Sequence, residues 1–331
     1  KPMAITPSGI IGLFFIDTST TEIYTELSVR PLLPTTVAGQ VCWIRNGSEG
    51  VASIGKTSVF PVPFFGNRAK PRSIYEEIPG TLPEFAKFSV SHQEWAPDAE
   101  LIPRYTQLVD LYGIVKDNSS TIIAQSQVEM ESQLADLIGL GASTAVAYEN
   151  YTKNFFAVDH EANPNRPGLA TFSNYKTNFN LNYTNLATAL DLLDAAPGPD
   201  GNPLSMPGKK LVIVSTGAQE AEARKLLNGD YIASVAGTAT ESNPLKGRAE
   251  VLKLTRLRQY NSGKFWCVVL VADAKHRPFM LSQVLPPQLY ISDVDINSTS
   301  QALRSVARQG WKSVHGFGYL WPQLAVGCVE S

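Results

Sequence analysis

Residues 50–57 (GVASIGKT) match the spacing of a phosphate-binding P-loop, G-x-x-x-x-G-K-[ST]. In such a loop a helix begins at the second glycine, and the amides and dipole of its first turn hold the phosphates. Here Pro61 and Pro63 would fall inside that helix, at a cost of about 3 kcal/mol each. Val59 and Phe60 favour a strand instead. We therefore expect a loop that leads into a strand, and a P-loop nucleotide hydrolase is the alternative.

The histidines do not form a catalytic set with the neighbouring residues. Residues 159–161 (DHE) are the densest group of candidate metal ligands, but no second ligand pair lies at a suitable spacing, so we expect a solvated loop. His92 has no obvious nucleophile nearby, and His276 and His315 are isolated. The sequence also contains neither G-x-S-x-G nor H-E-x-x-H. We therefore predict no enzyme activity, no catalytic residue, no metal site and no cofactor.

The cysteines and one glycine pair also favour structural roles. Cys42, Cys267 and Cys328 are odd in number and far apart, which is typical of neither a disulfide framework nor a zinc site. Cys267 lies in an apolar run, where a buried and inert thiol is the usual state. Residues 139–141 (GLG) follow a helical pattern and not a strand, so they favour a kink over a dinucleotide site.

The composition excludes several classes of protein. Of the 331 residues, 44% are hydrophobic and 18% are charged, and the formal net charge is −2. This balance is typical of an ordered globular protein, and it lacks the basic excess with which most proteins grip nucleic acid. No apolar run reaches the roughly 18 residues that span a bilayer, so no membrane partner is expected. Sequons keep a secreted binding protein as a further alternative, although so short a motif arises by chance. They lie at Asn46, Asn118, Asn150, Asn182 and Asn297.

The first hundred residues favour extended structure. Residues 1–37 predict an arm with one short helix near residues 18–27, and residues 40–45 and 88–95 predict strands. The proline-bearing stretch between the two strands is too long for a structureless loop inside a compact domain. We therefore expect a projecting two-stranded loop that finds its partners on another subunit.

Two groups of charged residues could make contacts between molecules. The projecting loop carries Arg68, Lys70, Arg72, Glu76, Glu77 and Glu84. A solvated turn and salt bridges to a neighbouring subunit are both open for this group, since charges at the rim of an interface set register and specificity. A basic stretch farther on contains Lys246, Arg248, Lys253, Arg256 and Arg258. It could face packaged nucleic acid or a neighbour's acids, or form an ordinary exposed strand face.

The remaining two thirds predict a long helix followed by a small α/β unit. Apolar spacing predicts a helix that Ser119 or Ser120 caps and that Gly139 and Gly141 break, followed by a second helical run over residues 142–151. Helices are then expected over residues 186–196 and 218–227, and strands over residues 210–215, 249–257, 265–273 and 288–296. Residues 301–316 carry scattered apolar side chains, and residues 323–329 close the chain.

Several of these stretches resemble the major capsid proteins of tailed phages, which have the Hong Kong 97-like fold, and are most similar to the Mu-like major head subunit family. The resemblance covers about residues 110–331, whereas the first hundred residues match in plan only. It rests on residues 170–177 (ATFSNYKT), 201–204 (GNPL), 207–215 (PGKKLVIVS), 218–227 (AQEAEARKLL), 265–273 (FWCVVLVAD) and 322–325 (PQLA).

This resemblance implies an α+β capsid fold divided into five parts. They are an N-terminal arm (residues 1–37), an extended loop region (38–96), a peripheral domain with a long spine helix (97–163), an α/β axial domain (164–286), and a return through the peripheral sheet that ends in the axial domain (287–331). Some family members lose an N-terminal segment during maturation, and a start at Lys1 is consistent with that or with a trimmed chain. We do not predict covalent crosslinking.

The resemblance also implies a structural function. The chain would form hexamers and pentamers of an icosahedral or prolate shell around double-stranded DNA, without sequence-specific binding. Portal, scaffold and decoration proteins would be its partners, and the virion capsid, assembled in the cytoplasm of a bacterial host, its location. An encapsulin-like compartment, which shares this fold but holds enzyme cargo, is the alternative.

Overall fold

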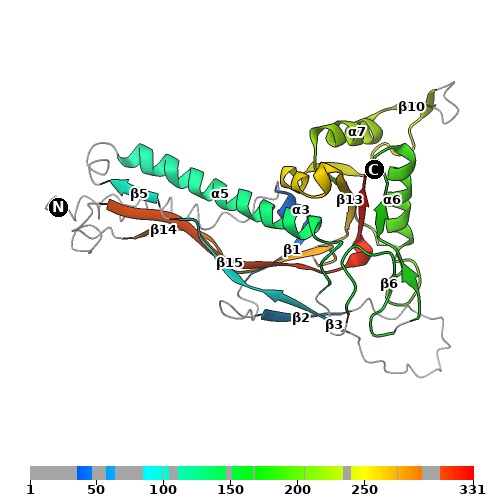
Figure 1. Ribbon diagram of the computed structural model, residues 1–331, viewed down its shortest axis with the longest axis horizontal. Coiled ribbons are helices and arrows are strands. Elements are labelled where there is room, and N and C mark those ends of the chain that lie inside the picture. The colour runs from blue at the N-terminus through cyan, green and yellow to red at the C-terminus, as the bar shows by residue number, and fades with distance from the viewer. Residues whose placement is uncertain are drawn as a thin grey trace, which may run out of the picture.

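The computed structural model describes most of the chain as a mixed α+β structure with two five-stranded sheets (Figure 1). Helix α5 (Leu111–Gly139) has 29 residues and runs along one of these sheets. The described residues are 36–46, 57–63, 85–98, 100–103, 111–146, 151–166, 168–204, 206–233, 240–273, 275–292 and 306–331.

The first sheet, here called the short-stranded sheet, has the strand order β12-β9-β13-β16-β8. Strands β9 and β12 run parallel with helix α7 between them in the chain, and β13 is antiparallel to β9 and β16. Successive residues of β13 are buried, so both faces of this strand are covered, as its continuous apolar run predicts. The strands are β8 (Tyr175–Thr177), β9 (Lys209–Val214), β12 (Glu250–Lys253), β13 (Phe265–Val271) and β16 (Ala325–Val329).

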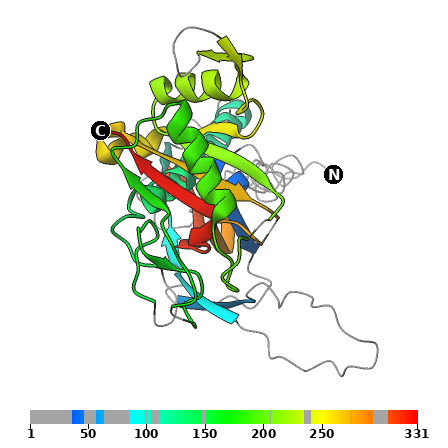
Figure 2. The same ribbon diagram turned by 90° about the vertical axis from the view of Figure 1, so that its right-hand side faces the viewer.

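Two capped helices accompany the short-stranded sheet. Helix α6 (Tyr183–Ala195) begins after Asn182, whose side chain accepts a hydrogen bond from the amide of Asn185, and it packs on β13 and β16 (Figure 2). Helix α7 (Gly217–Asn228) begins with a capping box between Thr216 and Gln219. Both helices and the strand before α7 were predicted to within three residues, because caps and apolar spacing agree there.

The second sheet, here called the long-stranded sheet, has the order β1-β14-β15-β4, and β5 also pairs with β15. Strands β14 and β15 have 14 residues each and are antiparallel. Pro286 and Pro287 lie in β14 where the register shifts between Leu285 and Gln288, which is where a strand tolerates proline. The strands are β1 (Cys42–Asn46), β4 (Gln93–Trp95), β5 (Glu100–Pro103), β14 (Phe279–Ser292) and β15 (Val306–Tyr319).

Helix α5 packs on β15 and begins earlier than the sequence predicts. It starts at Leu111, so Ser119 and Ser120 lie inside the helix and the predicted cap there is wrong. The reason is that a polar Asn-Ser-Ser run is compatible with a helix face as well as with a cap. The helix ends at Gly139 as predicted. A Cβ at that position would lie 2.1 Å from the ring of Tyr260, so close packing also favours glycine there.

A two-stranded ribbon lies on the side of the long-stranded sheet opposite α5 (Figure 1). Strands β2 (Thr57–Pro63) and β3 (Phe85–Ser91) pair along their full lengths in antiparallel fashion. This β2–β3 ribbon confirms the predicted two-stranded loop, and β4 continues the chain from β3 into the sheet. Residues 64–84, between the two strands, lie outside the described residues, as does the predicted helix near residues 18–27.

Other predicted boundaries were wrong or incomplete. The predicted helical run over residues 142–151 is absent from the described residues 142–146, which form turns and a bridge from Ala145 to Asn154. The strand predicted over residues 249–257 ends at Lys253 and is followed by a 3-10 helix, η2 (Thr255–Gln259). Residues 301–316 were given no element, yet β15 covers most of them, because their partners come from distant parts of the chain. Similarly, β14 begins well before the predicted strand over residues 288–296.

Aromatic side chains join the two sheets into one core. Phe155 stacks on Tyr319 of β15 with ring centroids 4.6 Å apart and meets Phe279 of β14 at 5.2 Å. On its other side it contacts Phe156, which in turn contacts Phe265 of β13. Among the described helices, none is long and apolar enough to cross a membrane.

The remaining described elements are short. They are helix α3 (Val37–Val41), strand pairs β6 (His160–Glu161) with β7 (Thr171–Phe172) and β10 (Tyr231–Ala233) with β11 (Thr240–Ser242), and the 3-10 helices η3 (Asn261–Gly263) and η4 (Pro322–Leu324). Arg277 donates hydrogen bonds to three carbonyls at the end of α3, those of Gly39, Gln40 and Cys42, and so fixes the entry into β1.

Candidate functional site

The residues predicted to contact a neighbouring subunit lie outside the described residues. All six belong to the stretch between β2 and β3: Arg68, Lys70, Arg72, Glu76, Glu77 and Glu84. Their contacts with a neighbouring subunit stay a prediction. The described part of this region is its base, where the β2–β3 ribbon meets the long-stranded sheet.

The P-loop pattern is followed by a strand and not by a helix. Thr57, the last residue of the pattern, is the first residue of β2, and Val59 pairs with Ser89 of β3. The expected strand is therefore confirmed, and the helix N-terminus that a phosphate would need is not formed at this position. Residues 50–56 lie outside the described residues.

Most side chains of the basic stretch form ion pairs with acidic residues of the same chain. Arg248 lies 3.2 Å from Asp191, and Lys253 lies 3.1 Å from Glu220. Lys246 pairs with Asp230. Arg256 and Arg258, in η2, have no ion-pair partner among the described residues. The stretch is therefore largely an exposed, internally paired surface, the third of the interpretations that the sequence left open.

His160 is buried, so the predicted solvated loop at residues 159–161 is wrong. Its ring lies between the hydroxyl of Tyr151, at 2.7 Å, and the carbonyl of Phe155, at 3.0 Å. Burial lowers the pKa of His160 to about 4, against the opposing effect of the Phe155 carbonyl. Asp159 remains exposed and pairs with Lys153. The described residues hold no group of three His, Cys, Asp or Glu side chains that could bind a metal.

The base of the β2–β3 ribbon is attached to the body through three residues, every second one along the chain, whose side chains point towards the body. Phe88 meets Trp321 edge-on at 5.6 Å, Val90 packs with Met280 and Trp43, and the Nε2 of His92 lies 2.9 Å from the hydroxyl of Ser282. All three are buried and alternate with the partly or fully exposed Ser89 and Ser91, so one side of the chain faces the body. We call Phe88, Val90 and His92 the ribbon seam.

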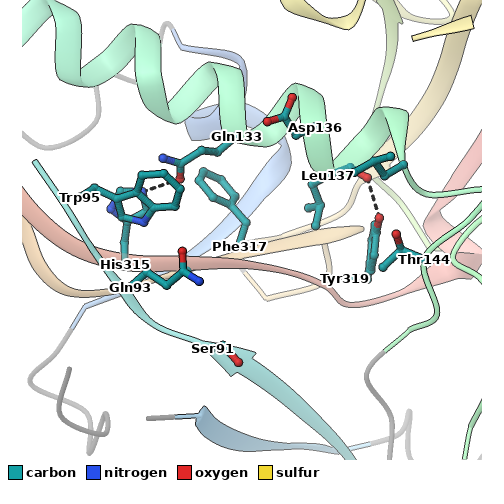
Figure 3. Close-up of a pocket in the computed structure, with 12 residues that line it drawn as sticks. Ser91, Gln93, Trp95, Gln133, Asp136, Leu137, Thr144, His315, Phe317 and Tyr319 are labelled. Carbon is teal, nitrogen blue, oxygen red and sulfur yellow. Dashed lines mark hydrogen bonds between the residues drawn. The ribbon is translucent and has the colours of Figure 1, made fainter. Parts of the chain in front are cut away.

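A pocket of about 490 Å³ opens between α5 and β15, beside the point where β4 ends (Figure 3). Its lining includes Trp95 and His315, whose rings stack 5.8 Å apart, and Tyr319, whose hydroxyl donates to the carbonyl of Leu137. The indole N–H of Trp95 is buried and has no hydrogen-bond acceptor among the described residues. On this edge, β15 pairs with β4 from Ser313 to His315. No described strand continues the pairing along residues 316–319.

His315 ties the long helix to the sheet at this pocket. Its Nε2 lies 2.7 Å from the Oε1 of Gln133 in α5, and its Nδ1 lies 2.9 Å from the hydroxyl of Ser313. Burial, together with the smaller effect of the nearby His92, lowers the pKa of His315 to about 4. The ring is therefore neutral at neutral pH, with Nε2–H donating to the amide oxygen and Nδ1 accepting from the serine.

Cys267 is buried in β13, as its apolar run predicts. Cys42, Cys267 and Cys328 are free and buried, and burial raises the pKa of each thiol above its usual value. Sequence reasoning missed the seam and His315, because both depend on which distant strands pair. The alternation of Phe88, Val90 and His92 is the one signal that could have marked a buried face.

No family model matches the sequence, and no curated protein matches it. Solved capsid structures do resemble the fold. The capsid of the cyanophage P-SCSP1u is 12% identical, with a TM-score of 0.55, over 89% of this chain and 88% of that one. A structure from Mycobacterium phage Patience is 13% identical, with a TM-score of 0.51, over 97% and 88%. The capsid of an empty GTA particle is 11% identical, with a TM-score of 0.51, over 99% and 100%.

At such low identity these likenesses bear on the fold alone. They extend over 89–99% of this chain and 88–100% of each matched chain. The chain has the α+β, Hong Kong 97-like fold of phage capsid subunits.

Proposed function

We propose that this chain is the major capsid protein of a tailed phage or phage-like particle. Copies of it would assemble as hexamers and pentamers into an icosahedral or prolate shell, located in the virion and assembled in the cytoplasm of a bacterial host. One observation carries the proposal: the chain and the GTA capsid chain match over 99% and 100% of their lengths. A match of this extent supports a shell role for the chain as a whole and not for one part of it.

Features that a single subunit leaves incomplete support a role in assembly. Among the described strands, β2 and β3 pair only with each other, and the ribbon projects from the body. Residues 316–319 of β15 have no described strand on one edge. Backbone groups at such an edge can accept an added strand from another molecule. Closed symmetry then repeats each contact many times, which makes individually weak contacts sufficient.

We assign the parts of the subunit as the resemblance implies. Residues 1–37 would be the N-terminal arm, 38–96 the extended loop region, 97–163 the peripheral domain, 164–286 the axial domain, and 287–331 the return segment. The six charged residues between β2 and β3 would pair with a neighbouring subunit. The finer assignment to the Mu-like head subunits rests on sequence stretches such as residues 207–215 and 218–227, which form β9 and α7.

Double-stranded DNA is the proposed content of the shell. The internally paired basic stretch supports enclosure without sequence-specific binding, because Arg248 and Lys253 already have acidic partners. Portal, scaffold and decoration proteins would complete the particle.

Electron microscopy of the purified protein, produced with any native N-terminal extension and scaffold, tests this proposal. Uniform closed shells several hundred ångströms across are expected, and nuclease-protected DNA inside native particles would separate a phage head from an encapsulin-like compartment. Small monodisperse particles under those conditions would refute the proposal. Nucleotide binding lost on Lys56→Ala would instead revive the P-loop alternative.

A further inference from the structure

We propose that Gly316 and Gly318 of β15 form a slot that fixes the direction of the β2–β3 ribbon, and that this slot sets the geometry of the assembled shell. The second half of this inference rests on the proposed capsid function. The first half concerns the single subunit and can be tested without any assembly.

The slot is formed because β3 crosses β15 at very short range. An ideal Cβ on Gly318 would lie 2.6 Å from the Cγ2 of Val90, and one on Gly316 would lie 2.1 Å from the carbonyl oxygen of Ser91. Real Cβ atoms essentially never approach a neighbour within 3.0 Å. Any side chain at either position would therefore push the ribbon away from the sheet.

The two glycines belong to the face of the sheet that the ribbon covers. Gly318 is paired with Met280 and Gly316 with Ser282, so side chains at these four positions point to the same side of the sheet. That side carries the partners of the seam, since Met280 contacts Val90 and Ser282 bonds to His92. The glycines thus remove bulk at the crossing, while the flanking strand supplies the contacts.

The crossing is where the direction of the ribbon is decided. Up to Ser91 the chain pairs with β2, and from Gln93 it pairs with β15, so His92 is the single residue between two sheets. The seven residues of β3 span about 24 Å, and a tilt of about 10° at the seam would move the far end by about 4 Å. Such a shift exceeds what a hydrogen-bonded or salt-bridged contact with a neighbour tolerates.

Gly318→Ala is the central test, because its clash is with a side chain that can be shortened. We expect the variant to fold but to give at least a tenfold lower yield of closed shells, or shells of altered diameter. The double variant Val90→Ala with Gly318→Ala removes the Cγ2 that the new methyl group would meet, and we expect it to restore at least half of the shell yield. Gly316→Ala meets backbone, so Val90→Ala should not rescue it.

A matched control is Gly217→Ala, at the first position of α7. A Cβ there would meet only the Nζ of Lys253, at 3.7 Å, so shell yield and diameter should match those of the wild type. Hydrogen exchange of the unassembled subunits gives a second readout. Gly318→Ala should speed exchange of the β3 and β4 amides at least tenfold and leave β9 and β13 unchanged.

The outcomes separate the slot from the capsid function. Wild-type shells together with unchanged Gly318→Ala shells would overturn the inference, as would a folded double variant that is not rescued. If the wild type forms no shells, the capsid proposal fails, and exchange in β3 alone decides whether the slot holds the ribbon. If Gly318→Ala also loosens β9 and β13, the double variant decides: slow exchange restored in all four strands supports the slot, and exchange that stays fast overturns it.

Discussion

The two five-stranded sheets are built on different principles. In the short-stranded sheet the central strands are apolar and covered on both faces. Buried polar groups there have hydrogen-bond partners. Ser215 donates to the carbonyl of Gly263 at 2.7 Å, and the indole N–H of Trp266 donates to the carbonyl of Phe179 at 3.0 Å. The long-stranded sheet instead buries Ser282, Ser313 and His315, beside a pocket and an edge without a described partner strand.

This contrast indicates a division of labour within one subunit. The short-stranded sheet is close to complete as a folded unit, although the Nε2 of Gln219 beneath it lacks a described partner. The long-stranded sheet has more buried polar groups without a described hydrogen-bond partner, including the N–H of Trp95 and the Nε2 of Gln283. Stability should therefore reside in the first sheet, and sensitivity to conditions and neighbours in the second.

The sharpest test of this contrast compares one tryptophan from each sheet. Trp266 is fully buried in β13, and Trp266→Ala should lower the free energy of unfolding of the unassembled subunit by about 3–5 kcal/mol. Trp95 is partly exposed and its N–H has no acceptor in the described part of the chain, so Trp95→Ala should cost about 1 kcal/mol. Urea unfolding followed by circular dichroism measures both, and equal losses would contradict the contrast.

Acid should weaken the long-stranded sheet through His315. Its pKa is lowered to about 4 in the folded state from 6.5, so between these values the unfolded chain binds more protons. The free energy of unfolding should therefore fall as pH drops from about 6.5 towards 4, by up to about 3 kcal/mol from this residue. His315→Gln should flatten that slope in urea titrations of the subunit.

His160 provides the comparison for this titration, because its pKa is also lowered to about 4 and it lies outside both sheets. His160→Gln should remove its own share of the slope. The contribution of His315 should remain in that variant. A pH profile that neither substitution alters would show that other groups govern acid stability.

A smaller effect tests whether the short-stranded sheet depends on its local caps. Thr216→Ala removes the hydroxyl that accepts from the amide of Gln219 at 3.2 Å, and should cost about 1 kcal/mol. Thr184→Ala, in the exposed first turn of α6 but not at its cap, is the control and should change the urea midpoint little. A larger loss from Thr184→Ala than from Thr216→Ala would be incompatible with the capping assignment.

The smallest effect concerns the paired surface beside the short-stranded sheet. Arg248→Ala should cost about 0.5 kcal/mol at low salt and less at high salt, because its bonds to Asp191 and Asp194 are solvent-exposed. Arg256→Ala removes a residue with no ion-pair partner in the described chain and should leave stability unchanged. A loss above about 2 kcal/mol from Arg248→Ala would show that this surface is not the solvated face described above.

Local patterns predicted the short-stranded sheet better than the long-stranded one. Residues 210–215 and 265–273 are continuous apolar runs, and the first leads into the capped helix α7, so the local sequence places β9, α7 and β13. Strand β15 carries His315, Gly316 and Gly318 among its apolar residues, and its pairing with β14 decides its state. Because glycine has no side chain, the two glycines weakened the strand pattern of β15. The same lack of a side chain lets β3 cross β15 closely at these positions.

The candidate site was predicted in outline only. The proline-bearing stretch after Thr57 correctly indicated a projecting ribbon, because prolines are tolerated in a strand that lies at an edge. The buried His92 and His160 were missed, because the partners that make their burial tolerable, Ser282 and Tyr151, are set by tertiary packing.

The order of strands has a consequence for how the chain folds. Strand β16 lies between β13 and β8, yet it is made after β14 and β15, which belong to the other sheet. While a chain is being synthesised, β13 therefore has one bare edge, and β1 waits for β14 from a distant part of the sequence. Such non-local pairing slows folding and exposes strand edges to other nascent chains. These edges therefore stay open to other chains until synthesis has passed β16.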